Sequence, residues 1–220
     1  MNAPNFCYHC MTPLPTGANA CPHCGVDVDS VQNNANQLAV GSILAGTYLV
    51  GRTLGQGGCG ITYIGYDINL DLRVAIKEYF PQGFVTRAQT GRGQITAVSG
   101  EMGAWFIKSR DSFVQEAKTL AKFAGEPAIV NVRSFFMENG TADIVMDYVK
   151  GKTLKQLAAE NGGKLPAKRV LDYLSPVMRS LQTVHEAGLL HRDIAPDNIM
   201  VRAKDDRAVL LIWFNIQSCL

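Results

Sequence analysis

The sequence has little net charge, few aromatic residues (8%) and no long hydrophobic segment. Its 220 residues include 21 Lys and Arg and 19 Asp and Glu, interspersed along the chain, which gives a net charge of +2. This near balance gives no electrostatic reason to expect binding to nucleic acid or to an anionic membrane. No apolar stretch approaches the roughly 20 residues that span a bilayer, and the N-terminus lacks the features of a signal peptide. We therefore expect a cytoplasmic protein with no membrane segment.

Cysteine is scarce except at the N-terminus, where four of the six cysteines form two CxxC pairs, Cys7 with Cys10 and Cys21 with Cys24. Two such turns present four thiolates to one ion, in the tetrahedral arrangement that zinc prefers. Gly25 suits the left-handed backbone that follows such a turn. Two disulfides or a redox motif are the alternatives, but a redox CxxC normally opens a helix of a larger domain. We predict a structural zinc ribbon over residues 1–25, whose folding energy comes from the metal.

Two later segments are polar and show no helical or strand periodicity. Residues 26–45 are rich in Asn and Gln, and we expect a flexible linker. Residues 81–102 are rich in Gly and polar side chains, and we interpret them as an inserted loop whose role the sequence does not reveal.

The first phosphate-binding pattern is GxGxxG at Gly55, Gly57 and Gly60. By itself the pattern is weak, because dinucleotide-binding folds share it. A dinucleotide-binding turn opens a helix, whereas the β-branched and aromatic residues of Ile61 to Tyr66 favour a strand. We therefore expect the glycines in a hairpin, where backbone amides approach phosphate oxygens with no Cβ in the way. A further strand then carries Val-Ala-Ile-Lys, ending at Lys77.

The most informative stretch is His191 to Asn198, which reads HRDIAPDN. Together with the glycine pattern and Val-Ala-Ile-Lys, it makes the chain resemble a bacterial-type Ser/Thr protein kinase. The sequence IKEYFP, which begins at Ile76, resembles a subgroup of these kinases that often carry a zinc ribbon. The resemblance implies an α+β, protein-kinase-like fold with a five-stranded antiparallel N-lobe, helix C and a partial helical C-lobe. It places the N-lobe and hinge at residues 46–149 and the partial C-lobe at residues 150–220.

The same resemblance implies roles for individual residues. The three glycines hold the ATP phosphates, Lys77 meets the α and β phosphates and pairs with Glu116, Asp193 is the catalytic base, and Asn198 binds Mg²⁺. His191 and Arg192 are scaffold. The adenine side of the site is implied to include Ala75, the gatekeeper Met146, and the main chain at Asp147 and Val149.

Helices are expected at three places, the first and the third from the 3.6-residue period and the second after a turn at Gly151. The first is Ser109 to Ala124, with Asp111 or Ser112 as a candidate cap and Glu116 inside it. A short second helix runs from Leu154 to Glu160. The third runs from Pro166 to Ala187 and ends at Gly188. Its expected buried stripe is Val170, Leu174, Val177, Met178, Leu181 and Val184.

The sequence departs from the kinase pattern at two places. Ala195 stands where Ser/Thr kinases carry a Lys that steadies the γ-phosphate, which predicts slower transfer. Trp213, Phe214 and Asn215 stand where Asp-Phe-Gly is expected, so the main protein ligand of magnesium is lost at a cost of several kcal/mol. The sequence stops at Leu220, before an activation segment. We expect either a coding change that truncated a kinase or a genuine short pseudokinase, with a marginally stable C-terminal half in both cases.

Two main functions follow as hypotheses. The chain is an ATP-dependent Ser/Thr kinase domain with Mg²⁺ as cofactor, zinc in its ribbon and an unknown protein substrate. Alternatively it is a truncated, inactive pseudokinase that acts as a binding module, which the loss at Trp213 favours. A third and weaker hypothesis is an interaction protein that works through its zinc ribbon.

Overall fold

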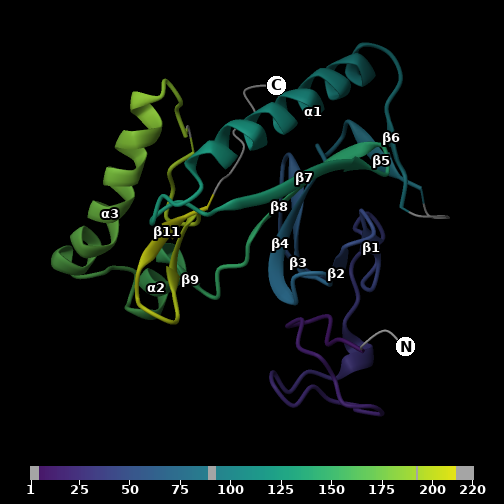
Figure 1. Ribbon diagram of the computed structural model, residues 1–220, viewed down its shortest axis with the longest axis horizontal. Coiled ribbons are helices and arrows are strands. Elements are labelled where there is room, and N and C mark those ends of the chain that lie inside the picture. The colour runs from purple at the N-terminus through teal and green to yellow at the C-terminus, as the bar shows by residue number, and fades with distance from the viewer. Residues whose placement is uncertain (1–4, 89–92, 192, 212–220) are drawn as a thin grey trace. The chain divides into compact units, whose positions relative to one another are not determined.

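The computed structural model describes residues 5–88, 93–191 and 193–211. These residues form two units: the first comprises residues 5–115 and 133–148, and the second comprises residues 116–132 and 149–211. Each unit has its own sheet and hydrophobic core, and Figure 1 shows their elements. The fold is protein-kinase-like, with an antiparallel sheet in the first unit and helices after it.

The first unit is built on a six-stranded sheet in the order β1-β2-β3-β4-β8-β7. Its strands are β1 (Ile43–Leu44), β2 (Tyr48–Gly57), β3 (Gly60–Asp67), β4 (Leu72–Tyr79), β7 (Val132–Glu138, of which 133–138 belong to this unit) and β8 (Thr141–Asp147). Alternating β-branched and aromatic residues produce the strands, and Tyr63, Ile76 and Ile144 have no exposed surface. Each such side chain contributes about 1.5–3 kcal/mol of burial energy. The sheet contains the expected five strands and one additional short strand, β1.

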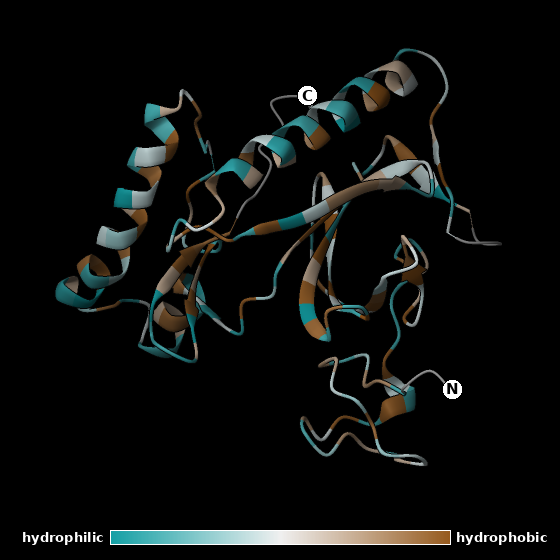
Figure 2. Ribbon diagram, in the orientation of Figure 1, coloured by the Kyte–Doolittle hydropathy of each residue, from teal (hydrophilic) through white to brown (hydrophobic). Residues whose placement is uncertain are grey.

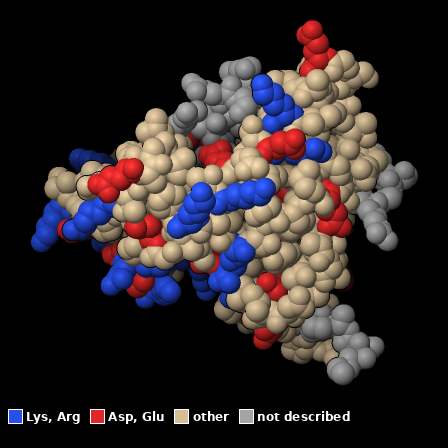
Figure 3. Space-filling view, turned by 45° about the horizontal axis from the view of Figure 1, so that its top comes forward, with Lys and Arg blue, Asp and Glu red and all other residues tan. Residues whose placement is uncertain are grey.

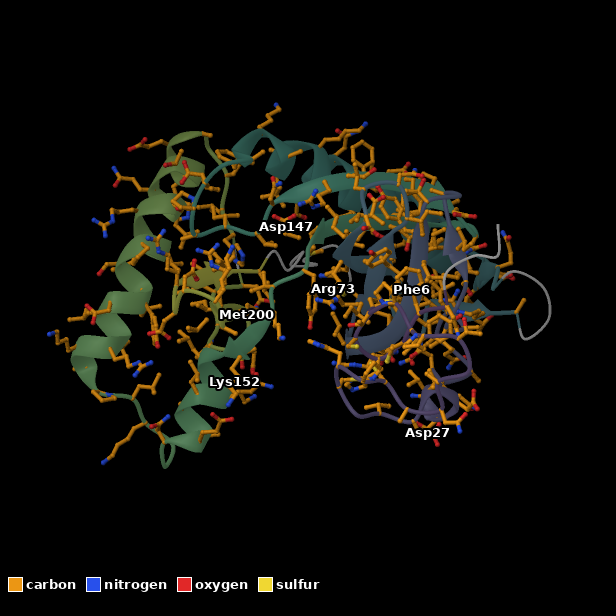
Figure 4. The ribbon with its side chains drawn as sticks, turned by 60° about the horizontal axis from the view of Figure 1, so that its bottom comes forward. Phe6, Asp27, Arg73, Asp147, Lys152 and Met200 are labelled. Carbon is orange, nitrogen blue, oxygen red and sulfur yellow. The ribbon has the colours of Figure 1, made fainter. Side chains whose placement is uncertain are left out.

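The N-terminal segment is packed on this sheet. Phe6 lies against Tyr66 of β3 with ring centroids 4.4 Å apart, and Figure 4 labels Phe6. A 3₁₀ turn, η1 (Val28–Ser30), is capped by Asp27, whose carboxylate accepts the N–H of Asp29 at 3.0 Å.

Residues 26–45 differ from the expected flexible linker, because their polar side chains bond to the sheet. The Asn33 amide donates to the carbonyl of Gly51 at 3.0 Å, and its oxygen accepts the N–H of Thr53 at 2.9 Å. Leu38 is buried, and its N–H donates to the Tyr63 hydroxyl at 3.0 Å. Asn and Gln, which suggested a solvated chain, are here the side chains that attach it.

Residues 81–102 are also more regular than the expected loop. They contain a hairpin of β5 (Val85–Arg87) and β6 (Ile95–Ala97), and then helix α1 (Glu101–Leu120) begins. The helix therefore starts eight residues before the predicted Ser109, and Ser112 lies within it and does not cap it. Gly103, in the first turn of the helix, lies close to the preceding segment, because a Cβ there would be 2.6 Å from the Val98 carbonyl. The glycines of this segment, which had suggested a loop, therefore include one that the helix start requires.

The second unit has a three-stranded sheet in the order β11-β10-β9, with strands β9 (Gly151–Thr153), β10 (Ile199–Arg202) and β11 (Ala208–Leu210). Lys152 of β9 and Met200 of β10 are labelled in Figure 4. Helix α2 (Leu154–Glu160) has the predicted bounds and begins with a capping box between Thr153 and Gln156. A 3₁₀ turn, η2 (Ala121–Phe123), follows α1.

Helix α3 (Ala167–Glu186) confirms the predicted long helix, and Gly188 follows it at φ +78°. Figure 2 shows its hydrophobic residues gathered along one side. The stripe is centred differently from the prediction: Tyr173, Val177 and Leu181 are in the core, whereas Met178 is 55% exposed. Successive residues of a helix are rotated by about 100°, so Met178, next to Val177, points away from the core, and the predicted stripe was wrong at this residue.

Candidate functional site

The four N-terminal cysteines converge on one point. Their Sγ atoms all lie within 4.8 Å of one another, and the Cys7–Cys24 and Cys10–Cys21 pairs are each 3.7 Å apart. Around a tetrahedral zinc ion with Zn–S bonds of about 2.3 Å, the sulfur atoms lie about 3.8 Å apart. A disulfide would require about 2.05 Å. The cluster is therefore compatible with zinc and not with two disulfides.

Both CxxC turns end in a left-handed residue. Gly25 has φ +73° and donates to the Cys21 carbonyl at 2.8 Å, as the sequence predicted. In the first turn the same position is Met11, with φ +53° and a 2.7 Å bond to the Cys7 carbonyl. Met11 has no exposed surface, so its packing offsets the backbone strain that glycine avoids in the second turn. Burial raises the pKa of the Cys7 thiol to about 12, and a bound cation would oppose that rise by stabilising the thiolate.

Two arginines of the sheet hold the first turn. Arg52 donates its N–H to the Tyr8 carbonyl at 2.8 Å and its Nε to the His9 carbonyl at 3.0 Å. Arg73, labelled in Figure 4, donates Nε to the Cys10 carbonyl at 2.7 Å. The cysteine cluster is thus attached to β2, which carries Gly55 and Gly57, and to β4, which carries Lys77.

The glycine pattern lies in the predicted hairpin. Gly57 of β2 pairs with Gly60 of β3, and Gly55 pairs with Thr62. A Cβ on Gly60 would lie 2.6 Å from the Glu78 carbonyl, so this glycine is required by the neighbouring strand. A Cβ on Gly55 would meet no atom within 4 Å. A Cβ on Gly58, at the tip of the hairpin, would likewise meet no atom within 4 Å, so no described neighbour blocks the approach of a phosphate to either glycine.

Lys77 and Ala75 lie on β4, between β3 and β8. Lys77 pairs with Thr62 of β3 and Ile144 of β8 and is 4% exposed. Ala75 pairs with Met146 of β8, and both are buried. Because residues two apart in a strand share a face, Ala75 and Lys77 lie on the same face of the sheet, as a surface for one nucleotide requires.

The expected hinge residues lie at the end of β8 and directly after it. Asp147 ends that strand and forms an ion pair with Arg133 of β7. The division between the two units falls between Tyr148 and Val149. The predicted use of their main-chain groups for adenine stays a prediction.

In the second unit, residues 193–198 form a closed loop. The Asn198 amide nitrogen donates to both the carbonyl and the Oδ2 of Asp193, each at 2.9 Å, and Asn198 is 6% exposed. The Asn198 N–H donates to the Ala195 carbonyl at 2.9 Å. The structure therefore brings Asp193 and Asn198 together. With the amide nitrogen used in the loop, the amide oxygen is the atom of Asn198 that could hold a cation.

His191 supports this loop as predicted. Its Nε2 lies 3.1 Å from the Leu211 carbonyl, and the Asp193 N–H lies 3.4 Å from its Nδ1. These contacts assign the proton to Nε2, which donates, and leave Nδ1 as an acceptor. A histidine bonded at both nitrogens is a scaffold side chain here.

Glu116 lies on α1 in the second unit and is partly buried, whereas Lys77 belongs to the first unit. Their predicted ion pair stays a prediction. Arg192, Trp213, Phe214 and Asn215 lie outside the described residues.

Sequence reasoning missed two sets of contacts around these positions. Lys155 of α2 forms an ion pair at 2.9 Å with Asp197 of the loop. Glu78, directly after Lys77, forms a buried ion pair at 2.6 Å with Arg87. The charged Glu78 within the apolar stretch IKEYFP could have suggested that it has a buried partner. Which residue is that partner depends on how residues 81–102 fold.

Acidic and basic side chains are interspersed on the face shown in Figure 3, in agreement with the near-zero net charge. Within the described residues, no helix is both long and apolar enough to cross a bilayer.

Comparison with known families gives one match over most of the chain. The model of the protein kinase domain matches residues 48–216. A probable serine/threonine-protein kinase of Clostridium acetobutylicum is 32% identical over 177 residues, covering 80% of this chain and 23% of that protein. The serine/threonine-protein kinase PknG of Mycolicibacterium smegmatis is 29% identical over 209 residues, covering 89% of this chain and 24% of that protein. The chain thus spans about a quarter of the length of these curated relatives.

Solved structures give the same similarity. PpkA-294 in its apo form matches with a TM-score of 0.73 and 34% identity, covering 84% of this chain and 63% of that one. The PknI kinase domain of Mycobacterium tuberculosis matches with a TM-score of 0.61 and 27% identity, covering 80% of this chain and 61% of that one.

Proposed function

The chain belongs to the protein kinase family, and we propose its function from that membership and from the geometry of the site. Membership of this family implies ATP and Mg²⁺ as ligands. We propose that the chain binds ATP and transfers its γ-phosphate to a Ser or Thr hydroxyl of a protein. The observation that carries the proposal is the hydrogen bond from the Asn198 amide nitrogen to the Asp193 carboxylate, because it holds the candidate base beside the side chain proposed to bind the metal.

In this proposal most residues that contact the nucleotide belong to the first unit. Gly55, Gly57 and Gly60 receive the phosphates, and the open space at Gly55 supports this role. Lys77, with Glu116 as its partner, neutralises the α and β phosphates. The adenine lies against Ala75 and bonds to main-chain groups at Asp147 and Val149, where no particular side chain is needed.

The second unit supplies the chemistry. Asp193 accepts the proton of the attacking hydroxyl, and Asn198 holds Mg²⁺ through its amide oxygen. When bound, Mg²⁺ neutralises charge that develops on the β and γ phosphates. The Asn198 bond fixes the direction of the Asp193 carboxylate before substrate arrives, which lowers the cost of organising the site.

We further propose that Cys7, Cys10, Cys21 and Cys24 bind one structural zinc ion in a ribbon over residues 1–25. Residues 26–45 connect it to the kinase region at residues 46–149 and 150–220. A cytoplasmic location, where cysteines stay reduced, is part of this proposal. The 3.7 Å sulfur separations support a bound ion.

A second candidate function is nucleotide binding without transfer, as a pseudokinase. One observation favours it: Trp213 occupies the position of the magnesium-binding Asp, and an indole cannot bind a hard cation. Ala195, in place of the expected Lys, points the same way.

Transfer of radiolabelled γ-phosphate from ATP to a generic Ser/Thr substrate, with Mg²⁺, distinguishes the two candidates. Activity that Asp193→Asn abolishes would establish the kinase. Stabilisation by ATP with no transfer, in the parent and in Asp193→Asn alike, would establish the pseudokinase. An Asp197→Asn variant is the matched control, because Asp197 lies in the same loop and pairs with Lys155 on the surface.

A further inference from the structure

A buried ion pair ties the inserted hairpin to the strand that carries Lys77. Arg87, at the end of β5, donates Nη2 to Glu78 Oε2 at 2.6 Å, and the two side chains are 2% and 1% exposed. Glu78 directly follows Lys77 on β4, so the two side chains point to opposite faces of the sheet. A displacement of Glu78 therefore moves the backbone of Lys77.

Arg87 also holds the chain on both sides of it. Its Nη1 donates to the Gly93 carbonyl at 2.6 Å and its Nε donates to the Asn36 carbonyl at 3.1 Å. These bonds use the planar fork of the guanidinium in three directions, which a lysine could not reproduce. One side chain thus joins the insertion, the 26–45 segment and β4.

Glu78 is held from a second direction by Tyr63 of β3. The Tyr63 hydroxyl donates to Glu78 Oε2 at 2.9 Å and accepts the N–H of Leu38 at 3.0 Å. The buried Glu78 carboxylate therefore accepts two hydrogen bonds, one from Arg87 and one from Tyr63.

The start of the insertion is bonded to the tip of the glycine hairpin. The Phe80 N–H donates to the Cys59 carbonyl at 3.1 Å, and the Gln82 N–H donates to the Gly58 carbonyl at 2.9 Å. Gly60 packs on the main chain of Glu78, as its missing Cβ requires. The hairpin, Glu78 and the insertion therefore form one connected structure within the first unit.

The local charges make Glu78 depend on Arg87. Asp143 of β8 lies directly opposite Glu78 in the sheet and is also buried. Its Oδ1 has no hydrogen-bond partner among the described residues. Burial raises the pKa of Glu78, while Arg87 opposes that rise. Without Arg87, two carboxyl groups would face each other in the core.

We propose that Arg87 is a positioning residue through which the insertion fixes Glu78, and thereby sets Lys77 and the glycine hairpin to receive the phosphates of a nucleotide. This inference rests on the proposed nucleotide-binding function. It assigns a role to residues 81–102 that the sequence did not reveal. Arg87 touches no substrate in this role and acts through Glu78.

The test compares three variants with the parent chain. Arg87→Met removes the cation that pairs with Glu78 and leaves the hydrogen bond from Tyr63 in place. Arg87→Met/Glu78→Leu replaces the buried ion pair with apolar side chains, which commonly restores stability without restoring the bonds to Gly93 and Asn36. Arg169→Met is the matched control, because Arg169 pairs with Asp206 at 3.3 Å on the surface of the second unit.

Calorimetry then gives the affinities of each variant for ATP and for adenosine, well below its melting temperature. We expect the double variant to bind ATP about tenfold more weakly, a difference of 1.4 kcal/mol, with unchanged affinity for adenosine. Adenosine lacks the phosphates that Lys77 would meet, so only a positioning role separates the two ligands. Equal losses for both ligands, or full recovery of ATP affinity in the double variant, would overturn the proposal.

A second readout needs no nucleotide. An amine-reactive reagent with peptide mapping reports the exposure of Lys77, with the exposed Lys152 as internal reference. We expect faster labelling of Lys77 in both Arg87 variants and no change in Arg169→Met. Unchanged labelling would overturn the positioning role. If the parent binds neither ligand, the proposed function fails, and the labelling alone decides whether Arg87 positions Lys77.

Discussion

The sheet that carries the glycine hairpin and Lys77 in the first unit is held by contacts between segments far apart in the sequence, whereas the Asp193 loop of the second unit has its central hydrogen bonds within the loop, with further contacts from Lys155 and Leu211. Leu38 bonds to Tyr63, and Arg73 bonds to Cys10, across 25 and 63 residues. Asn198 bonds to Asp193 across five. Changes in the first unit should therefore alter stability along with the site, and changes in the second should act chiefly on the loop.

Removal of the metal should have the largest effect on stability, and this effect should arise in the first unit. We expect a chelator under reducing conditions to release one zinc per chain and to lower the melting temperature by on the order of 10 °C, because structural zinc supplies folding energy directly. Metal analysis and calorimetry give the result. A Cys59→Ser variant, altered outside the cluster, should behave like the parent. Absence of metal in freshly purified, reduced protein would contradict the zinc assignment.

Two glycines of the same motif should respond differently to alanine. Gly60→Ala places a Cβ 2.6 Å from the Glu78 carbonyl and should cost about 1–3 kcal/mol. At roughly 2–4 °C per kcal/mol, thermal melting resolves this loss. Gly55→Ala meets no atom and should leave the melting temperature nearly unchanged while weakening ATP binding. Equal melting temperatures for the two variants would show that the hairpin is not held against β4.

In the second unit, Asn198→Ala should cost about 1–3 kcal/mol, because the two acceptors of Asp193 lose their donor in a mostly buried loop. Asp197→Ala, one residue away, removes a surface ion pair and should cost at most about 1 kcal/mol. Urea unfolding measures both. A larger loss in Asp197→Ala would mean that the surface pair, and not Asn198, holds the loop.

Asp143→Asn should have an effect of the opposite sign and stabilise the protein. Burial raises the pKa of Asp143 well above its ordinary value, and the nearby Glu78 and Glu138 add to the rise, while Arg87 opposes it. The folded state therefore favours the protonated acid, and stability falls as pH rises from the unfolded pKa of about 3.9 toward the folded pKa. Asparagine removes this titration, so the gain in melting temperature should grow from pH 4 to neutral pH. A gain that is constant with pH would mean that Asp143 does not titrate in this range.

The sequence was most informative where a local pattern suffices. The bounds of α2, the end of α3 at Gly188, the glycine hairpin and the strand with Lys77 were all predicted, because capping residues, φ preferences and strand periodicity act over a few residues. The convergence of the four cysteines was also predicted, because two CxxC turns have few ways to fold except around one ion.

It was least informative where composition resembled that of a loop. Residues 26–45 and 81–102 are polar and rich in small residues, yet the first segment bonds to the sheet and the second forms a hairpin and the start of α1. The exposed Met178 was misassigned for a related reason. Which apolar residue of a helix faces the core depends on the position of the neighbouring strand, and no local pattern contains that position.

The sequence by itself therefore determined the kinase family, and it predicted the candidate phosphate, base and metal-binding residues and the convergence of the four cysteines. Each of these depends on residue type at fixed spacing. The tertiary structure decided that Arg87 meets Glu78 and that the cysteine cluster is bonded to the sheet through Arg52 and Arg73. These contacts join segments whose separation in the chain carries no period, and they form because buried charges and carbonyl groups must find partners once water is excluded.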